Sequence, residues 1–157
     1  MKQTIDDAVN HLLTRLVYIG KHGLRTAAEY ILMELGVPGS YDGYQFMLTA
    51  IVLYVEDPVQ IILKGLYTAI ADQYGGKLTT TQIEQAMRKA IDISWKNGSR
   101  TAWFRYFSHL NGGKMVKPSN KDFVSHIGRV LDLWKGCCEA GVYLPCRKEN
   151  CYEQKEN

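Results

Sequence analysis

The chain has 157 residues, of which 46% are hydrophobic, and a formal net charge of +3. This size and composition allow one sizeable hydrophobic core and predict a single domain with short extensions. The sequence contains no apolar run long enough for a transmembrane helix and no signal-peptide pattern, so a soluble cytoplasmic protein is expected.

The small net charge conceals an uneven distribution. Residues 77–129 hold ten Lys or Arg against three Asp or Glu, a net charge of +7, whereas residues 1–76 carry −3 and residues 130–157 carry −1. A local excess of positive charge favours binding to a polyanion, because each neutralised phosphate releases counterions. A solvated basic face without a partner is the alternative.

Apolar residues recur at helical spacing along most of the chain, and no period-two strand pattern persists. The sequence therefore predicts an all-α fold, a multi-helix bundle with an extra N-terminal helix that packs within the domain or against a second copy. The expected organisation is an N-terminal amphipathic helix (1–24), a main domain (25–135) and a polar tail containing cysteines (136–157). Helices are predicted over residues 5–19, 26–35, 43–55, 59–74, 82–96, 101–110 and 121–134.

The helix predicted over residues 82–96 carries the most specific pattern. Thr81 and Glu84 have the spacing of a capping box, in which the two side chains satisfy backbone N–H groups at a helix start. The Gly75-Gly76 turn before this helix completes a helix-turn-helix arrangement. Amide side chains suit adenine and Arg or Lys suits guanine in the major groove. The candidate base-reading residues are Gln82, Glu84, Gln85, Arg88 and Lys89, for which an ordinary solvated face is the alternative.

A basic loop follows at residues 114–121, and Asn120 is expected to cap the last helix. Hydroxyl and Lys side chains near the predicted recognition helix suit DNA phosphates, which fix the register of a protein on the duplex. The candidate phosphate-contacting residues are Thr80, Thr81, Lys114, Lys117 and Lys121.

Other chemistry is sparse. The four cysteines of the tail have no Cys-x-x-Cys spacing, so free thiols are favoured over a zinc site or disulfides in a reducing compartment. No nucleophile–base pair, paired catalytic carboxylates or phosphate-binding loop is visible, so neither an enzyme nor a cofactor is predicted. The cysteines are Cys137, Cys138, Cys146 and Cys151.

Several separated motifs resemble the DNA-binding effector domain of the stage zero sporulation response regulator, the master transcription factor of endospore-forming bacteria. The resemblance covers about residues 26–134 and implies a helical domain whose helix-turn-helix binds promoter boxes in double-stranded DNA. It also implies tandem or head-to-tail copies on DNA and contact with RNA polymerase. The motifs are Glu34-Leu35-Gly36-Val37-Pro38, Gly43-Tyr44, Leu66-Tyr67, Ile70-Ala71, the series Glu84, Ala86, Arg88, Ala90, Ile91, Asp92, Trp95 and Gly98, and Lys117-Pro118-Ser119-Asn120 with Phe123.

The resemblance assigns base reading to the same five positions of the recognition helix. Glu84 and Arg88 match the family type, whereas Gln82 and Gln85 stand where the family usually has Arg, and Lys89 stands where it has His. A different preferred DNA sequence is therefore expected. The family's phosphoacceptor receiver domain has no counterpart here, which suggests an orphan effector, with dimerisation through the first helix as a hypothesis. A protein-interaction module or decoy that engages the sporulation or transcription machinery without reading DNA is the alternative function.

Overall fold

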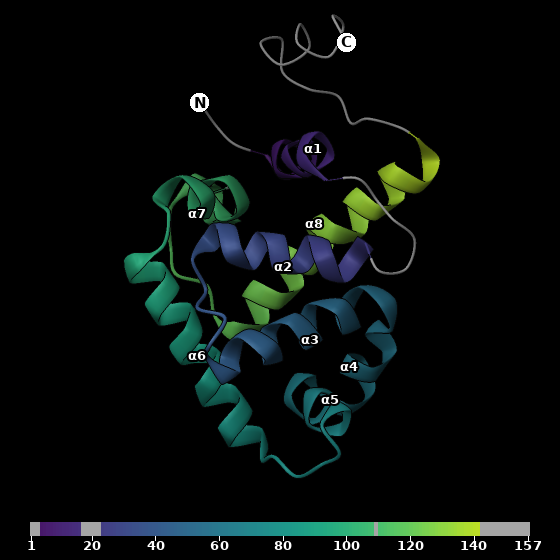
Figure 1. Ribbon diagram of the computed structural model, residues 1–157, viewed down its shortest axis with the longest axis vertical. Coiled ribbons are helices and arrows are strands. Elements are labelled where there is room, and N and C mark those ends of the chain that lie inside the picture. Colours follow the sequence, from purple (N-terminus) through teal and green to yellow (C-terminus); the bar gives the residue numbers. More distant parts are fainter. Residues whose placement is uncertain (1–3, 17–22, 109, 142–157) are drawn as a thin grey trace, which may run out of the picture.

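The computed structural model describes residues 4–16, 23–108 and 110–141, and all regular secondary structure within these ranges is helical (Figure 1). The predicted all-α fold class is confirmed. The helices are α1 (Ile5–Arg15), α2 (Gly23–Leu35), α3 (Asp42–Glu56), α4 (Pro58–Lys64), α5 (Leu66–Gln73), α6 (Thr80–Asn97), α7 (Arg100–Phe107) and α8 (Asn120–Ala140), with the 3₁₀ turn η2 (Leu110–Gly113) before α8.

Hydroxyl side chains determine where several of the helices begin. At α1, the Thr4 hydroxyl accepts a hydrogen bond from the Asp7 N–H, and the Asp7 carboxylate accepts one from the Thr4 N–H at 2.7 Å. At α7 the Ser99 hydroxyl accepts a hydrogen bond from the Ala102 N–H, and at α8 the Ser119 hydroxyl accepts one from the Asp122 N–H. These oxygens satisfy N–H groups that have no partner within the helix. The prediction that Asn120 caps the last helix is wrong, because Ser119 takes that place.

The helix predicted over residues 59–74 is two helices. Gly65 separates α4 from α5 and has a φ of +86°, which side chains with a Cβ rarely adopt. Ile62 and Leu63 belong to the apolar stripe of the predicted helix, yet they are 78% and 76% exposed in α4. The apolar spacing continues across the break, so periodicity alone does not reveal it.

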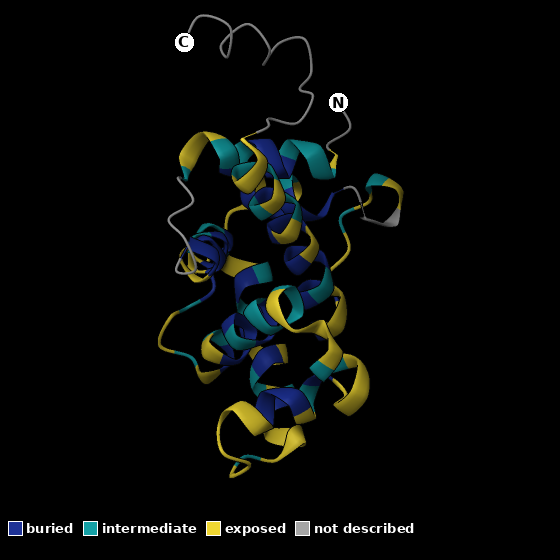
Figure 2. Cartoon of the chain, turned by 90° about the vertical axis from the view of Figure 1, so that its right-hand side faces the viewer, coloured by how far each residue is buried: buried dark blue, intermediate teal, exposed yellow. Residues whose placement is uncertain are grey.

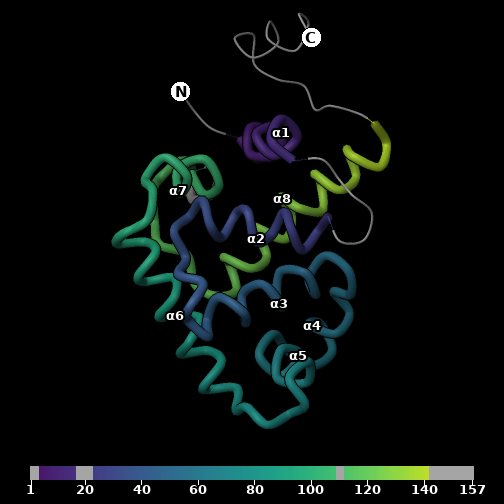
Figure 3. The backbone as a smooth tube through the Cα atoms, viewed as in Figure 1, coloured from purple at the N-terminus to yellow at the C-terminus, as the bar shows by residue number. Residues whose placement is uncertain are grey.

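α1 shares the hydrophobic core of the other helices. Ala8, Val9 and Leu12 are fully buried, and α1 packs against α7 and α8. The helix ends at Arg15 rather than at residue 19, and residues 17–22 lie outside the described ranges. Of the two packing roles considered for this helix, the structure shows packing within the domain. Figure 3 shows that α1 lies at the end of the molecule opposite the α5–α6 turn.

α3 runs through the middle of the bundle and contacts α2, α4, α5, α6 and α8, so it is the support on which the helix-turn-helix rests. Figure 2 shows the buried residues on the inward sides of these helices. Behind α6, an aromatic cluster joins α7 to α8: the ring centroid of Phe107 lies 5.0 Å from that of Trp103 and 5.3 Å from that of Phe123.

α8 is longer than predicted and continues to Ala140 rather than ending at Trp134. Cys137 and Cys138 therefore lie on this helix and are half-buried. Cys146 and Cys151 lie outside the described residues.

No single helix in the described part of the chain is long and apolar enough to span a membrane. Only α3 and α4 taken together are long and apolar enough, and they bend by 107° where they join.

Candidate nucleic-acid interface

α5 and α6 form the helix-turn-helix, and residues 74–79 connect them (Figure 1). Tyr74 attaches the beginning of this turn to α3, since its ring packs edge-on against Phe46 and its hydroxyl lies 3.0 Å from the Thr49 hydroxyl. Gly75 and Gly76 then adopt φ values of +77° and +71°, with nothing within 4 Å of where a Cβ would be. The turn is thus anchored at its start and bends through two unsupported glycines.

α6 lies unusually close to the helix beneath it. A Cβ on Gly43 of α3 would lie 2.2 Å from the carbonyl oxygen of Ala86, and a Cβ on Gly98 would lie 2.0 Å from the carbonyl oxygen of Leu35. Only glycine allows backbones to approach so closely. Both glycines belong to the motifs quoted for the family resemblance, and the structure shows why: they fix the depth at which α6 is seated. The buried face of α6 is Ile83, Met87, Ala90, Ile91 and Ser94.

The start of α6 differs from the sequence prediction. The capping box is formed by Thr79 and Gln82 rather than by Thr81 and Glu84: the Gln82 N–H donates to the Thr79 hydroxyl at 3.1 Å, and the Thr79 N–H donates to Gln82 Oε1 at 2.9 Å. α6 therefore begins two residues earlier than predicted, and Thr81 lies in its first turn. One oxygen of a predicted base-reading residue is already engaged, which leaves the Gln82 NH₂ group as its available donor.

The five predicted base-reading side chains lie along the outward face of α6, and all are exposed except the half-exposed Glu84. Arg88 and Glu84 form an ion pair at 2.5 Å, one helical turn apart. The ammonium of Lys89 lies 5.2 Å from the centre of the Tyr41 ring, at the other edge of the helix. Gln85 follows Glu84 in sequence and is exposed. α1 packs at the opposite end of the domain, so it leaves this face uncovered (Figure 1).

Two of the predicted phosphate-contacting residues line a cleft of about 430 Å³ between α6 and the start of α8. Lys117 forms a 2.6 Å ion pair with Asp92 of α6, and Lys121 is exposed on the first turn of α8. Glu84 and Arg88 also line this cleft, so the structure brings two base-reading candidates and two phosphate candidates around one opening. Thr80, Thr81 and Lys114 are exposed but do not line it.

The sequence interpretation missed the role of Asn120, whose side chain is 93% buried beside this cleft. Its Nδ2 group donates to the Glu84 carbonyl oxygen at 3.0 Å and to the Tyr67 hydroxyl at 3.2 Å. One amide therefore joins α8 to both helices of the helix-turn-helix. The sequence signals were its place in the Lys117-Pro118-Ser119-Asn120 motif and a polar residue beside the apolar stripe of the last helix.

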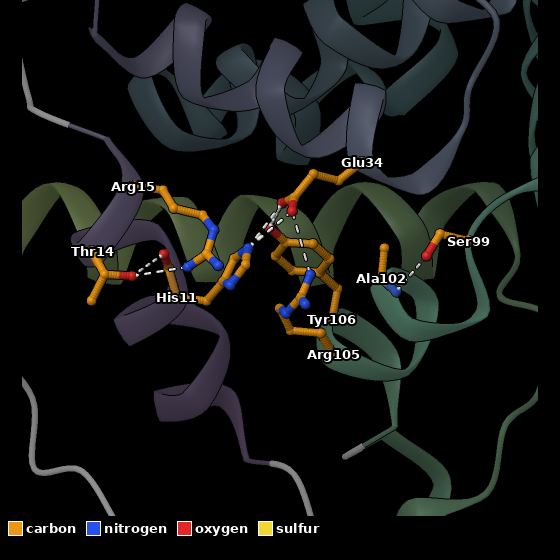
Figure 4. Close-up of polar contacts among 8 residues, drawn as sticks. All are labelled: His11, Thr14, Arg15, Glu34, Ser99, Ala102, Arg105 and Tyr106. Carbon is orange, nitrogen blue, oxygen red and sulfur yellow. Dashed lines mark hydrogen bonds and ion pairs between the residues drawn. The ribbon is translucent and has the colours of Figure 1, made fainter. Parts of the chain in front are cut away.

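A second polar cluster, also missed, lies away from this surface and joins α1, α2 and α7 (Figure 4). Glu34 of α2 accepts hydrogen bonds from the Tyr106 hydroxyl and from His11 Nε2 at 2.9 Å, and Arg105 lies 3.4 Å from the same carboxylate. Burial alone disfavours the charged carboxylate, but the hydrogen bonds from His11 and Tyr106, together with the charges of His11 and Arg105, outweigh it, so the pKa of Glu34 is lowered. Burial and the hydrogen bond to Glu34 raise the pKa of Tyr106. This cluster fastens the additional N-terminal helix to the domain.

Within the described residues, no group of three or more His, Cys, Asp or Glu side chains is arranged to hold a metal ion. Burial raises the pKa of the Cys137 thiol, so its surroundings do not favour the thiolate that a metal requires. The two cysteines beyond residue 141 are outside the part that the structure describes.

The family model for the C-terminal domain of the sporulation initiation factor Spo0A matches residues 28–131. This match spans about two thirds of the chain, from within α2 to within α8, and includes the whole helix-turn-helix. The family comprises DNA-binding effector domains of sporulation transcription regulators, and α1 lies outside the matched part. The chain therefore belongs to the family of Spo0A C-terminal domains.

Proposed function

We propose that this protein regulates transcription by binding specific DNA sequences, with α6 docked in the major groove. The observation that supports the proposal is the exposed polar face along the first half of α6, on a helix whose other face is held tightly against α3. The major groove of B-DNA admits an α-helix, and each base pair presents there a distinct pattern of donors and acceptors. A rigidly seated helix can match such a pattern at low entropic cost.

The proposed roles follow from the side-chain chemistry. Arg88 donates to the acceptors of guanine, and the ion pair with Glu84 holds its guanidinium over the outward face. Gln85 and the NH₂ group of Gln82 pair with base edges, and Lys89 supplies a donor at the Tyr41 edge of the helix. The phosphate backbone is bound on either side of these groups. Its proposed contacts are Thr80, Thr81, Lys114, Lys117 and Lys121, all exposed.

Partners beyond DNA form part of the proposal. The resemblance described in the sequence analysis implies tandem copies on adjacent sites and contact with RNA polymerase, and we include both in the proposal. The apolar residues of α1 are buried within its own chain, so a homodimer formed through that apolar face would require α1 to leave the core. We therefore place any contact between copies on another face of the domain.

A second function, a protein-interaction module, is favoured by one observation. Val59, Ile62 and Leu63 of α4 are all more than half exposed, and no residue of this helix is buried. Exposed apolar side chains that gather on one element often mark a protein-binding surface. A decoy acting through α4 would have no need of base reading by α6, so DNA binding distinguishes the two functions.

The test measures binding to a duplex selected from a random-sequence pool by the intact wild-type protein, and to a scrambled duplex of the same composition. Arg88→Lys keeps the positive charge but loses the planar fork that pairs with guanine. We expect a loss of about 1–3 kcal/mol on the selected duplex and little change on the scrambled one. Lys117→Ala removes a phosphate contact and should weaken binding to both duplexes alike.

The proposal fails if the wild-type protein selects no sequence from the pool. It also fails if Arg88→Lys and Lys117→Ala lower affinity for the selected and scrambled duplexes in equal proportion, because α6 would then contribute charge without reading bases. Either outcome would favour the interaction module.

A further inference from the structure

The side chain of Asn120 is the one polar group in the described structure that is hydrogen-bonded to both helices of the helix-turn-helix. It comes from the first residue of α8 and reaches the Tyr67 hydroxyl on α5 and the Glu84 carbonyl oxygen on α6. The residue is only 7% exposed, so water does not compete freely for these bonds. A buried amide bonded to two elements resists their relative movement, because any displacement leaves its donors unsatisfied.

The connection between α5 and α6 is where such a constraint is needed. The turn contains two consecutive glycines with positive φ, and nothing packs within 4 Å of the Cβ position of either one. Glycine has more accessible backbone conformations than any other residue, so this turn does not fix the angle between the helices by itself. Asn120 supplies a cross-link between them from outside the turn.

The same residue also sets the position of the basic loop relative to α6. Its bond to the Glu84 carbonyl lies between two of the proposed base-reading residues, and the Lys117–Asp92 ion pair makes a second attachment two helical turns further along α6. The two attachments are about 12 Å apart along the helix axis. A loop held at two points cannot rotate about either, so phosphate-contacting and base-reading side chains keep a fixed spacing.

We infer that Asn120 is a positioning residue that sets sequence specificity, by holding α5, α6 and the basic loop in one arrangement. This inference rests on the proposed function. It assigns specificity to a residue outside the proposed DNA contacts. Losing its bond to α6 shifts base-reading groups relative to anchored phosphates, which lowers affinity for the preferred sequence more than affinity for any other sequence.

Asn120→Asp is the sharpest variant. The side chain keeps its shape, and a carboxylate at the start of α8 suits the helix dipole, but the group that donated to the Glu84 carbonyl is replaced by an acceptor. The change also adds one negative charge near the DNA. Lys121→Gln at the next, exposed position shifts the charge equally and leaves both hydrogen bonds of Asn120 intact, so it is the matched control.

The experiment measures the affinity of the intact protein for the selected duplex and for the scrambled duplex. The ratio of the first affinity to the second is then compared between variants. Lys121→Gln should weaken both and keep the ratio within about twofold, whereas Asn120→Asp should lower the ratio about tenfold, the equivalent of one lost base contact. A purely structural role would lower the thermal midpoint and leave the ratio of the folded protein unchanged.

Tyr67→Phe is the second variant, which removes one of the two acceptors with a minimal change of shape and keeps the test decisive if Asn120→Asp does not fold. Tyr67→Phe should also lower the ratio, by a smaller factor than Asn120→Asp does. If Asn120→Asp folds, equal ratios for Asn120→Asp and Lys121→Gln would overturn the inference. If Asn120→Asp does not fold, a wild-type ratio for Tyr67→Phe would overturn it. Either result would leave the proposed function standing. A wild-type protein without sequence preference would overturn both.

Discussion

Replacing Gly43 with Ala gives the most direct test of how α6 is seated. The added Cβ would lie 2.2 Å from the Ala86 carbonyl oxygen and 2.8 Å from the Ala90 Cβ, whereas ordinary contacts begin at 3.4 Å. Neither neighbour can rotate away, because one is backbone and the other is the first side-chain carbon. α6 must therefore move away from α3 by about 1 Å.

The expected cost combines two opposing effects. Overpacking of a closely packed core costs about 1–3 kcal/mol, and the rigid neighbours place this site in the upper part of that range. Replacing Gly by Ala within a helix contributes up to about 1 kcal/mol in the other direction. The free energy of unfolding should thus fall by about 1–2 kcal/mol, measured by urea denaturation followed by circular dichroism.

Gly136→Ala is the matched control for this measurement. Gly136 lies in α8 with nothing within 4 Å of its Cβ position, so only the helix-propensity gain applies, and the variant should be more stable by up to about 1 kcal/mol. Two identical substitutions should therefore have opposite signs. If Gly43→Ala matched or exceeded the wild-type stability, the close α3–α6 contact would not exist in solution, and the explanation of the Gly43-Tyr44 motif would be wrong.

Three further predictions test other parts of the structure. Leu12→Ala in the fully buried face of α1 should lower the free energy of unfolding by about 2–5 kcal/mol, whereas a detached α1 would give almost no change. Thr79→Ala should cost about 0.5–2 kcal/mol, and Thr81→Ala should change stability by less, which reverses the order expected from the sequence. The lowered pKa of Glu34 means that its carboxylate stabilises the fold above about pH 4.5 and that this contribution is lost as the pH falls through the folded-state value. Acid denaturation monitored by fluorescence should therefore show a shallower pH dependence in Glu34→Gln.

The helices were predictable because their hydrophobic periodicity reports burial, and outside α4 the buried residues follow the helical repeat. The helix boundaries were less predictable, because neighbouring residues offer the same capping groups. Residues 79–81 are three consecutive threonines, and both Thr79 with Gln82 and Thr81 with Glu84 have the spacing of a capping box. Thr79 is selected because Ile83 and Met87 must face α3 after a turn that starts at Tyr74. That geometric condition is tertiary and leaves no trace in the local sequence.

The side chains that fasten the domain together were beyond sequence reasoning for the same reason. The partners of Glu34 lie 23 residues before it and 72 residues after it, and those of Asn120 lie 36 and 53 residues before it. A lone polar residue beside an apolar stripe indicates that a partner is needed, but many residues meet that description. The exposure of the base-reading candidates could be predicted, since it needs only their own helix and a free surface.

The groups that seat α6 and the groups that point outward from it are separate sets. Gly43, Gly98 and Asn120 hold the helix through backbone contacts or a buried amide, so a change at any of them alters packing. Gln85 and Lys89 face outward, and a substitution there changes surface chemistry at little cost in stability. The seating residues belong to the family motifs, whereas departures from the family type fall on the outward face. Under the proposed function, substitutions on the outward face would therefore alter the DNA sequence that is read, and the seating of α6 would stay the same.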